Sequence, residues 1–266
     1  MRHFILNSMM ASLIAFLNLN GAYAEESKTI LGDFLKDKGI ELEVSGTMDL
    51  YSKYIWRGMR LDDDYVIQPG LAISGYGFEV SVWSSFDLDQ DDALNSDEVD
   101  TSITYTHDFK DLALFGHNLD TISVTVGHIY YDFPGAGTFS KETVLGLAYD
   151  TLLSPSVTWY HDYSQEAQGG GKGDYVVLDL SHSFDVIKEY GITFDLATHA
   201  GYNRKLFING EGGDWGISAG LTLPLTKNLT LSPNVNYSVP LGDVEDENDG
   251  NYEDEFYWSV ATAYTF

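Results

Sequence analysis

The stretch LEVSGTMDLYSKYIWR, Leu42–Arg57, alternates between two kinds of side chain along its length. One face is mostly apolar and consists of Leu42, Val44, Gly46, Met48, Leu50, Ser52, Tyr54 and Trp56. The other is mostly polar and consists of Glu43, Ser45, Thr47, Asp49, Tyr51, Lys53, Ile55 and Arg57. A period of two is typical of a strand with one apolar and one polar face. The alternation therefore predicts a first strand that runs from Leu42 to Arg57.

The same alternation recurs to the end of the chain, where Phe256, Trp258 and Val260 alternate with Tyr257 and Ser259. It indicates about twelve strands of roughly ten residues, the length of tilted membrane strands. Long polar links are expected at 58–64, 88–98, 133–138, 164–173, 204–212 and 240–253, and tight links lie between them. Long links outside and short turns in the periplasm are typical of outer-membrane barrels, and an even strand count leaves both termini periplasmic.

A soluble β-sandwich also alternates, so the two architectures must be separated. The apolar faces here end in aromatic residues, among them Tyr54, Trp56, Trp159, Trp215 and Trp258. Aromatic girdles of this kind flank the lipid-facing band of membrane barrels. The opposite faces are small and polar, which suits a wet lumen. We therefore predict an all-β fold, a transmembrane antiparallel up-and-down β-barrel over residues 40–266.

Composition excludes several classes of function. The chain has 14 basic and 41 acidic residues and a formal charge of -27, which argues against a nucleic-acid partner. It has no cysteine, so disulfides and thiolate catalysis are excluded. Residues 1–24 read as a signal peptide, with Arg2 before an apolar run and small residues before the expected cleavage after Ala24. Residues 25–39 are expected to form a periplasmic leader or a short amphipathic helix.

The basic residues of the first strand stand out in so acidic a chain. Lys53 and Arg57 share the polar face, so both are expected to point into the lumen near its outer mouth. The predicted lumen and selectivity residues are Asp49, Tyr51, Lys53, Arg57, Gln68, Glu79, Trp83 and Asp87. Two interpretations stay open. The cations form a solute-contacting constriction, or they neutralise lumenal acids such as Asp49, Glu79, Asp87, Asp108, Glu142, Asp179 and Asp195.

The segment DLYSKYIWRGMRLDDDYVIQPGLAISGYGFEVSVWSSFDL, Asp49–Leu88, resembles the opening of the TorF-type porin family. The matching positions are Ser52, Tyr54, Arg57, Gly58, Gln68, Pro69, Gly77, Trp83 and Ser85. The resemblance is close over these residues and extends beyond them only as a strand pattern. It implies an outer-membrane barrel that is called a porin mainly by analogy.

The sequence contains residues that two other kinds of site would need. Asp87, Asp89, Asp91 and Glu98 have the spacing of a calcium loop, but Asp92 stands where the sharp turn needs glycine. A solvated acidic loop is the alternative, and no other cofactor is predicted. An outer-membrane lipase would need a serine and a histidine near the outer rim. Ser84, His128 and His161 fall in that zone, but no motif joins them.

These observations predict a non-enzymatic channel for passive diffusion of small hydrophilic solutes in the outer membrane of a Gram-negative bacterium. The alternative is a structural or surface-interaction barrel whose acidic outer loops bind cations. The expected partners are outer-membrane lipid, lipopolysaccharide, the solute, and the barrel-assembly machinery, which would recognise the terminal Phe266.

Overall fold

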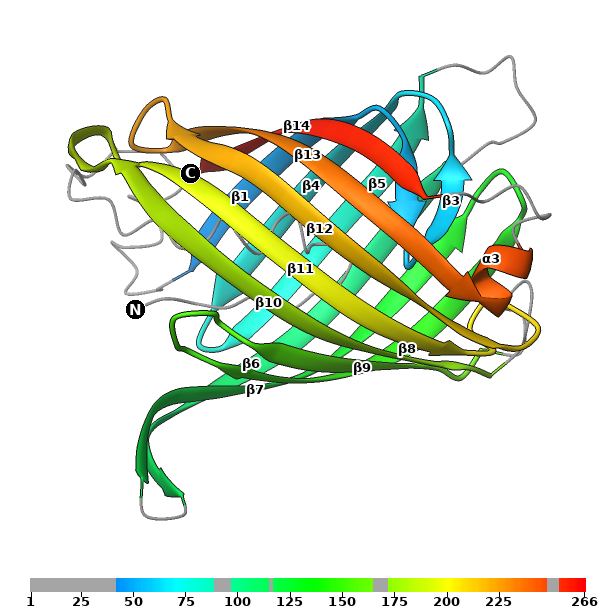
Figure 1. Cartoon of the computed structure of the whole chain (residues 1–266), viewed down its shortest axis with the longest axis horizontal. Helices are drawn as coiled ribbons and strands as arrows, with labels where there is room; N and C mark the ends of the chain where they lie inside the picture. The colour runs from blue at the N-terminus through cyan, green and yellow to red at the C-terminus, as the bar shows by residue number, and fades with distance from the viewer. Residues whose placement is uncertain (1–41, 89–96, 115–116, 165–171, 248–253) are drawn as a thin grey trace.

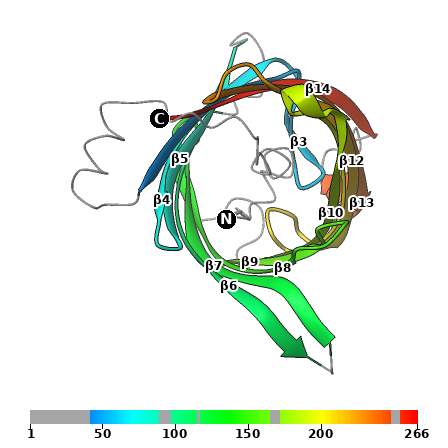
Figure 2. The same cartoon turned by 90° about the vertical axis from the view of Figure 1, so that its left-hand side faces the viewer.

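Twelve antiparallel strands close into a single barrel in the computed structural model, which describes residues 42–88, 97–114, 117–164, 172–247 and 254–266 (Figures 1 and 2). The wall strands are β1 (Glu43–Tyr51), β4 (Val66–Gly75), β5 (Phe78–Asp87), β6 (Glu98–Leu114), β7 (His117–Phe133), β8 (Thr138–Tyr149), β9 (Ser156–Asp162), β10 (Asp174–Ile187), β11 (Ile192–Arg204), β12 (Glu211–Pro224), β13 (Leu229–Gly242) and β14 (Glu255–Thr265). Each wall strand pairs with its neighbours along the chain, and β1 closes the ring on β14 from Ser45↔Thr265 to Tyr51↔Ser259. The prediction of an all-β barrel of about twelve strands is confirmed.

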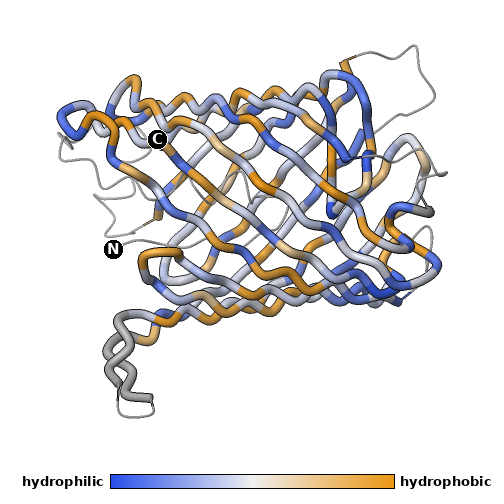
Figure 3. Tube along the Cα trace, in the orientation of Figure 1, coloured by the Kyte–Doolittle hydropathy of each residue, from blue (hydrophilic) through white to orange (hydrophobic). Residues whose placement is uncertain are grey.

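Side chains alternate across the wall as the sequence predicts. On β5, Phe78, Val80 and Val82 are exposed on the exterior, whereas Glu79 and Ser85 are buried on the lumen side. Small polar residues also line the lumen on other strands, and they include Ser123, Thr125, Ser156, Thr158, Ser232 and Ser259. The hydropathy pattern is visible along the strands in Figure 3. A sheet that is apolar outside and polar inside is the pattern of a barrel that faces lipid.

The two ends of the barrel differ. One end, called the turn end here, carries the tight links at 76–77, 150–155 and 225–228 and the short helix η3 (Lys188–Tyr190). Strands β6 and β7 also form a long hairpin that projects beyond this end (Figure 1). The opposite end, called the loop end, carries the longer links and the helix α3 (Asp243–Glu247). The described residues contain no helix that is long and apolar enough to cross a membrane.

The first strand is shorter than predicted. Strand β1 ends at Tyr51, and the chain then forms a separate hairpin from β2 (Tyr54–Trp56) and β3 (Met59–Asp62) before it rejoins the wall at Val66. Figure 2 shows β3 inside the ring of strands. The prediction of one strand to Arg57 is therefore wrong. Tyr54 and Trp56 are buried within the barrel, so they do not belong to the exterior aromatic girdle.

Candidate functional site

The hairpin β2–β3 reverses direction inside the lumen at a two-residue turn of Arg57 and Gly58. Both residues have positive φ, 50° and 78°, and the flanking Trp56 and Met59 are paired. Two consecutive positive φ angles are typical of the type I′ turn that matches the twist of a hairpin. A Cβ at Gly58 would lie 2.7 Å from the Cβ of Asp214 on β12. Glycine is thus required both by the backbone conformation and by the contact of the hairpin tip with the wall.

Arg57 joins the tip of the hairpin to strand β8. Its two terminal nitrogens each donate a hydrogen bond of 2.8 Å to the carboxylate of Glu142. Both side chains are almost fully buried, and the hydroxyl of Tyr131 donates a third bond of 2.9 Å to Glu142. Burial lowers the pKa of Arg57, but Glu142, Tyr131 and Tyr160 together raise it by more, so the pKa lies above its usual range. Arg57 is therefore a permanent cation.

Aromatic rings enclose the same guanidinium. Its central carbon lies 4.4 Å from the ring centre of Trp56, 4.5 Å from Tyr160 and 4.6 Å from Tyr175. Cation–π contacts are strongest where both groups are shielded from water. The three tyrosines Tyr131, Tyr160 and Tyr175 project from the wall into the lumen and are almost fully buried. The lumen faces, described from the sequence as small and polar, therefore also carry large aromatic residues in this part of the barrel.

The hairpin is also attached to strands β14 and β6. Lys53 Nζ donates a 2.6 Å hydrogen bond to Glu255, and Arg60 donates one of 2.9 Å to the same carboxylate. The hydroxyl of Tyr54 donates a 2.9 Å bond to Glu98 on β6. Together with the contacts at Arg57 and Gly58, these bonds hold the hairpin against four separate wall strands. It is a fixed part of the loop end.

An apolar cluster covers the hairpin at the loop end. Trp56 and Met59 pack with residues that follow β11 and with α3, namely Leu206, Phe207, Ile208 and Val244. The rings of Trp56 and Phe207 meet edge to face at 5.1 Å. Leu206, Ile208 and Val244 are fully buried. The lumen is therefore narrowed at this end by a small hydrophobic core.

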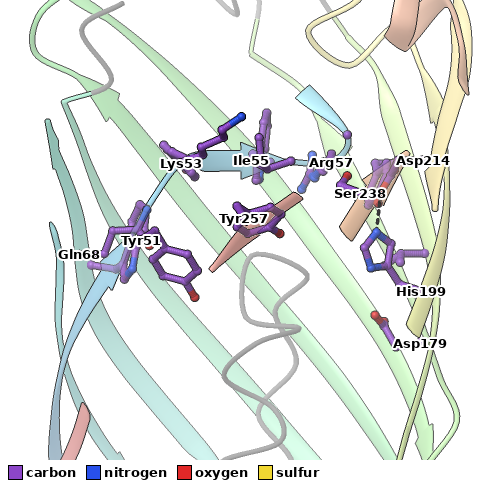
Figure 4. Close-up of a pocket in the computed structure, with 16 residues that line it drawn as sticks. Tyr51, Lys53, Ile55, Arg57, Gln68, Asp179, His199, Asp214, Ser238 and Tyr257 are labelled. Carbon is purple, nitrogen blue, oxygen red and sulfur yellow. Dashed lines mark hydrogen bonds and ion pairs between the residues drawn. The ribbon is translucent and has the colours of Figure 1, made fainter. Parts of the chain in front are cut away.

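A cavity of about 70 Å³ remains beside the hairpin (Figure 4). Figure 4 shows Tyr51, Lys53 and Gln68 on one side and Asp179, His199, Asp214 and Ser238 on the other. Trp83 and Tyr257 also line the cavity. His199 Nε2 lies 2.7 Å from Asp214 Oδ2, and the Tyr175 hydroxyl donates a 2.9 Å bond to Asp214 Oδ1. A water molecule needs roughly 10–15 Å³ of such space. The cavity therefore has room for several waters or for a group of a few non-hydrogen atoms.

The structure brings most of the predicted lumen residues together. Tyr51, Lys53, Arg57, Gln68 and Trp83 line this cavity. Asp49 and Asp87 are buried on the lumen side of β1 and β5. Glu79 is also buried, but it lies one residue after the start of β5 at the turn end and does not join the cavity. Lys53 and Arg57 lie on the inward hairpin and its approach, so their predicted position on the wall strand is wrong.

Sequence reasoning missed part of the site. It named Glu142 only as one of several lumenal acids, and it did not name Asp214, Tyr131, Tyr160 or Tyr175. A usable signal was the glycine-rich stretch around Asp214. A Cβ at Gly201 would lie 2.2 Å from the Tyr175 hydroxyl, and one at Gly216 would lie 2.3 Å from the His199 ring. These glycines leave the space in which the Tyr175, Asp214 and His199 side chains meet.

The predicted calcium loop is only partly described. Asp89 and Asp91 lie outside the described residues. Asp87 and Glu98 are buried, and Glu98 accepts the hydrogen bond from Tyr54 inside the lumen. Within the described part of the chain, no group of three or more His, Asp or Glu side chains is arranged to hold a metal ion. A calcium site at the acidic loops stays a prediction.

The histidines considered for catalysis have other contacts on the exterior. His128 Nδ1 lies 2.9 Å from the backbone oxygen of Glu142, and its ring packs near Tyr163. His161 stacks on Trp159 at 5.4 Å and lies 2.9 Å from Asp174 Oδ1. Both side chains therefore resemble the polar members of an aromatic girdle.

Comparison with protein families identifies the chain's relatives. The profile of Gcw_chp, described as a bacterial protein of unknown function, matches residues 38–238. This chain belongs to the Gcw_chp family. No curated protein sequence matches it. Because the Gcw_chp description gives no function, the TorF-type resemblance stays a prediction.

Solved structures with a similar fold include two porins and an outer membrane channel. The NanC porin has 13% identity and a TM-score of 0.51, with 84% of this chain and 99% of that chain covered. The KdgM porin, in complex with disordered oligogalacturonate, has 10% identity and a TM-score of 0.50, with 84% and 99% covered. An outer membrane channel from Pseudomonas putida F1 has 9% identity and a TM-score of 0.50, with 84% and 95% covered. At these identities the likeness shows the barrel fold of the Gcw_chp chain and not its solute.

Proposed function

We propose that this Gcw_chp protein is an outer-membrane channel through which small hydrophilic solutes diffuse past the hairpin β2–β3. The observation that carries the proposal is the charged cavity beside a hairpin that is fixed across the lumen. A channel needs a lipid-compatible exterior and a polar path, and the strands alternate accordingly. The similar solved structures are channels rather than enzymes, which supports a non-enzymatic role.

The size of the cavity limits the solute. About 70 Å³ beside Lys53, Gln68 and Trp83 suits ions and solutes of a few non-hydrogen atoms. The KdgM structure was solved with an acidic oligosaccharide. We expect a smaller and less acidic solute here, because the basic residues of the hairpin are already bound to Glu142 and Glu255.

The charge of the lumen favours cations. Acidic side chains on the lumen side include Asp87, Asp195, Asp214 and Glu255. Low-dielectric walls concentrate the field of such charges along a pore. The channel is therefore expected to conduct cations in preference to anions.

Single-channel recording in planar bilayers tests this proposal. The expected result is small, discrete conductance steps and a reversal potential on the cation-selective side under a salt gradient. A barrel that inserts but gives no steps would favour the alternative, a structural or surface-interaction barrel with cation-binding acidic loops. The apolar cluster around Trp56 and Phe207, which covers part of the mouth, is the observation that favours this alternative.

Location and assembly follow from the same proposal. Residues 1–24 would direct export, and both chain ends would face the periplasm together with the turn end. The backbone nitrogen of Phe266 donates a 2.9 Å bond to Val44, and its side chain is exposed on the exterior. We expect the barrel-assembly machinery to recognise this terminal aromatic ring.

A further inference from the structure

Basic residues on the exterior of the barrel are unevenly distributed. Among residues with described side chains, three basic ones lie at the hairpin and are bound to acids, namely Lys53, Arg57 and Arg60. At the turn end lie Lys188 and Lys227. The exterior of the loop end has four, which we call the cationic sector, and they are Lys141, Lys172, Arg204 and Lys205. All four lie within the run of neighbouring strands from β8 to the link after β11.

One carboxylate organises the centre of the cationic sector. Asp174 accepts hydrogen bonds from Trp159 Nε1 at 3.0 Å and from Arg204, and His161 Nδ1 lies 2.9 Å from its Oδ1. Asp174 is paired in register with His161 on β9 and with Arg204 on β11. The Arg204 side chain is nevertheless 57% exposed. The guanidinium is thus held in place on the barrel surface while much of it faces outward.

Lys141 is positioned by aromatic rings. Its ammonium nitrogen lies 4.7 Å from the ring centre of Phe139 and 5.9 Å from that of Tyr130. The backbone nitrogen of Tyr163 donates a 3.2 Å bond to the Lys141 carbonyl, which places the end of β9 beside it. Lysine side chains at a membrane interface lay their stems along apolar surface and keep the charge at headgroup level.

The surface below the cationic sector is apolar. Leu145, Val157, Val176 and Leu178 are exposed on the exterior of β8, β9 and β10, on the turn-end side of the cations. Figure 3 shows hydrophilic segments at the loop end of these strands. Cations above a band of exposed apolar side chains match an amphiphile with an anionic head and hydrocarbon chains.

We propose that the cationic sector binds the phosphate groups of a phosphorylated lipid in the leaflet at the loop end. Among the described residues of this run of strands, Asp174 is the one carboxylate on the exterior of the loop end, and Asp132 on β7, Glu211 on β12 and Asp243 on α3 flank the cationic sector. Asp174 is bonded as described, and Glu211 accepts a hydrogen bond from Tyr202. Asp132 lies on the same face of β7. Four cations against one described carboxylate leave a positive excess within the run from β8 to the link after β11, on a chain whose net charge is -27. Phosphate is the group that arginine and lysine bind through charge-assisted hydrogen bonds.

The proposal is tested with the full chain purified in detergent. The probes are diphosphorylated lipid A, the same lipid without phosphates, and inorganic phosphate. The melting temperature is expected to rise by several degrees with the diphosphorylated lipid alone. An equal rise with the dephosphorylated lipid would overturn the proposal, because the acyl chains would then account for binding. An equal rise with inorganic phosphate would also overturn it, in favour of a site for free phosphate.

Two double variants show which cations are responsible for the rise in melting temperature. Lys141→Gln with Arg204→Gln should lose at least half of the rise, whereas Lys188→Gln with Lys227→Gln removes two cations at the turn end and should keep it. If the first variant does not fold, Lys172→Gln with Lys205→Gln replaces it, since both lysines are exposed. If a folded variant of the cationic sector keeps the whole rise in melting temperature with diphosphorylated lipid A, the proposal is overturned. Failure of the channel proposal in bilayers would leave this test intact, because it does not depend on conductance.

Discussion

Arg57 at the tip of the hairpin and Glu142 on the barrel wall form a bidentate ion pair, with two bonds of 2.8 Å and side chains that are 1% and 0% exposed. They are 85 residues apart in the sequence. The chain leaves the wall after Tyr51 and extends into the lumen as far as Arg57. Because Arg57 is bound to Glu142 on the wall, this pair determines how far the hairpin extends across the lumen.

The Arg57–Glu142 pair should dominate the stability of the hairpin. Glu142→Gln leaves a buried guanidinium without its counter-charge, and removal of one partner of a buried pair costs about 3–5 kcal/mol. The free energy of unfolding from lipid vesicles measures this cost. Asp185→Asn breaks an exposed pair with Lys188 and should cost at most about 1 kcal/mol. A double replacement of Arg57 and Glu142 by methionine should recover most of the loss. Equal losses in the single and double variants would show that the charge itself is not the cause.

Gly58 should tolerate alanine less well than Gly137. Both have positive φ, 78° and 63°, so both substitutions incur backbone strain of about 1 kcal/mol or more. Only at Gly58 would the new Cβ collide with a neighbour, whereas at Gly137 nothing lies within 4 Å. The difference between Gly58→Ala and Gly137→Ala in unfolding experiments therefore isolates the packing of the hairpin tip on β12. Equal costs would mean that the tip is not tightly packed there.

Lys53 should influence ion selectivity. It lines the cavity and is partly exposed, and Lys53→Gln removes a positive charge while Glu255 keeps its negative one. The reversal potential under a salt gradient should therefore move further toward cation selectivity. Lys188→Gln at the turn end is the matched control and should leave the reversal potential unchanged. No shift in the folded Lys53 variant would assign Lys53 a purely structural role.

Charged substitutions on the exterior of the barrel should be destabilising. Ile217, near the middle of β12, is 44% exposed on the exterior, and the adjacent Ser218 faces the lumen. Ile217→Arg should cost about 2–4 kcal/mol if this face meets hydrocarbon, and Ser218→Arg should cost less. Unfolding from vesicles of both variants measures the difference. Similar costs at the two positions would contradict a lipid-facing exterior.

The strand pattern could be predicted from the sequence because every wall strand meets the same two environments. Leu71, Val82, Leu145 and Ile217 are exposed outside, and the residues between them face the lumen. This constraint repeats along all twelve strands, so a period of two is sufficient to find them. It does not distinguish a wall strand from a short strand inside the barrel. The alternation of Tyr54 and Trp56 with Ile55 therefore extended the predicted first strand too far.

The sequence indicates the hairpin turn only weakly. Type I′ turns usually contain Asn-Gly or Asp-Gly, and here an arginine precedes Gly58. The partner of Arg57 could not be chosen from the sequence, because many acids share the lumen and only the path of the hairpin selects Glu142. The cavity residues on the near wall were predictable, since Tyr51 and Gln68 lie on adjacent strands. The far wall, with Asp179, His199 and Asp214, depends on closure of the barrel.

The most direct test compares the single-channel conductance of the parent protein with that of a variant without the hairpin. Tyr51 and Val66 are paired across β1 and β4, so a short Gly-Ser linker can replace the residues between them. The variant also carries Glu142→Gln and Glu255→Gln, because both carboxylates lose their basic partners with the hairpin. We predict small steps for the parent and steps several-fold larger for the variant, because the hairpin crosses the lumen in the described part of the chain (Figure 2) and carries Trp56 and Met59 of the apolar cluster. Equal conductance, or no steps from either folded barrel, would contradict the account.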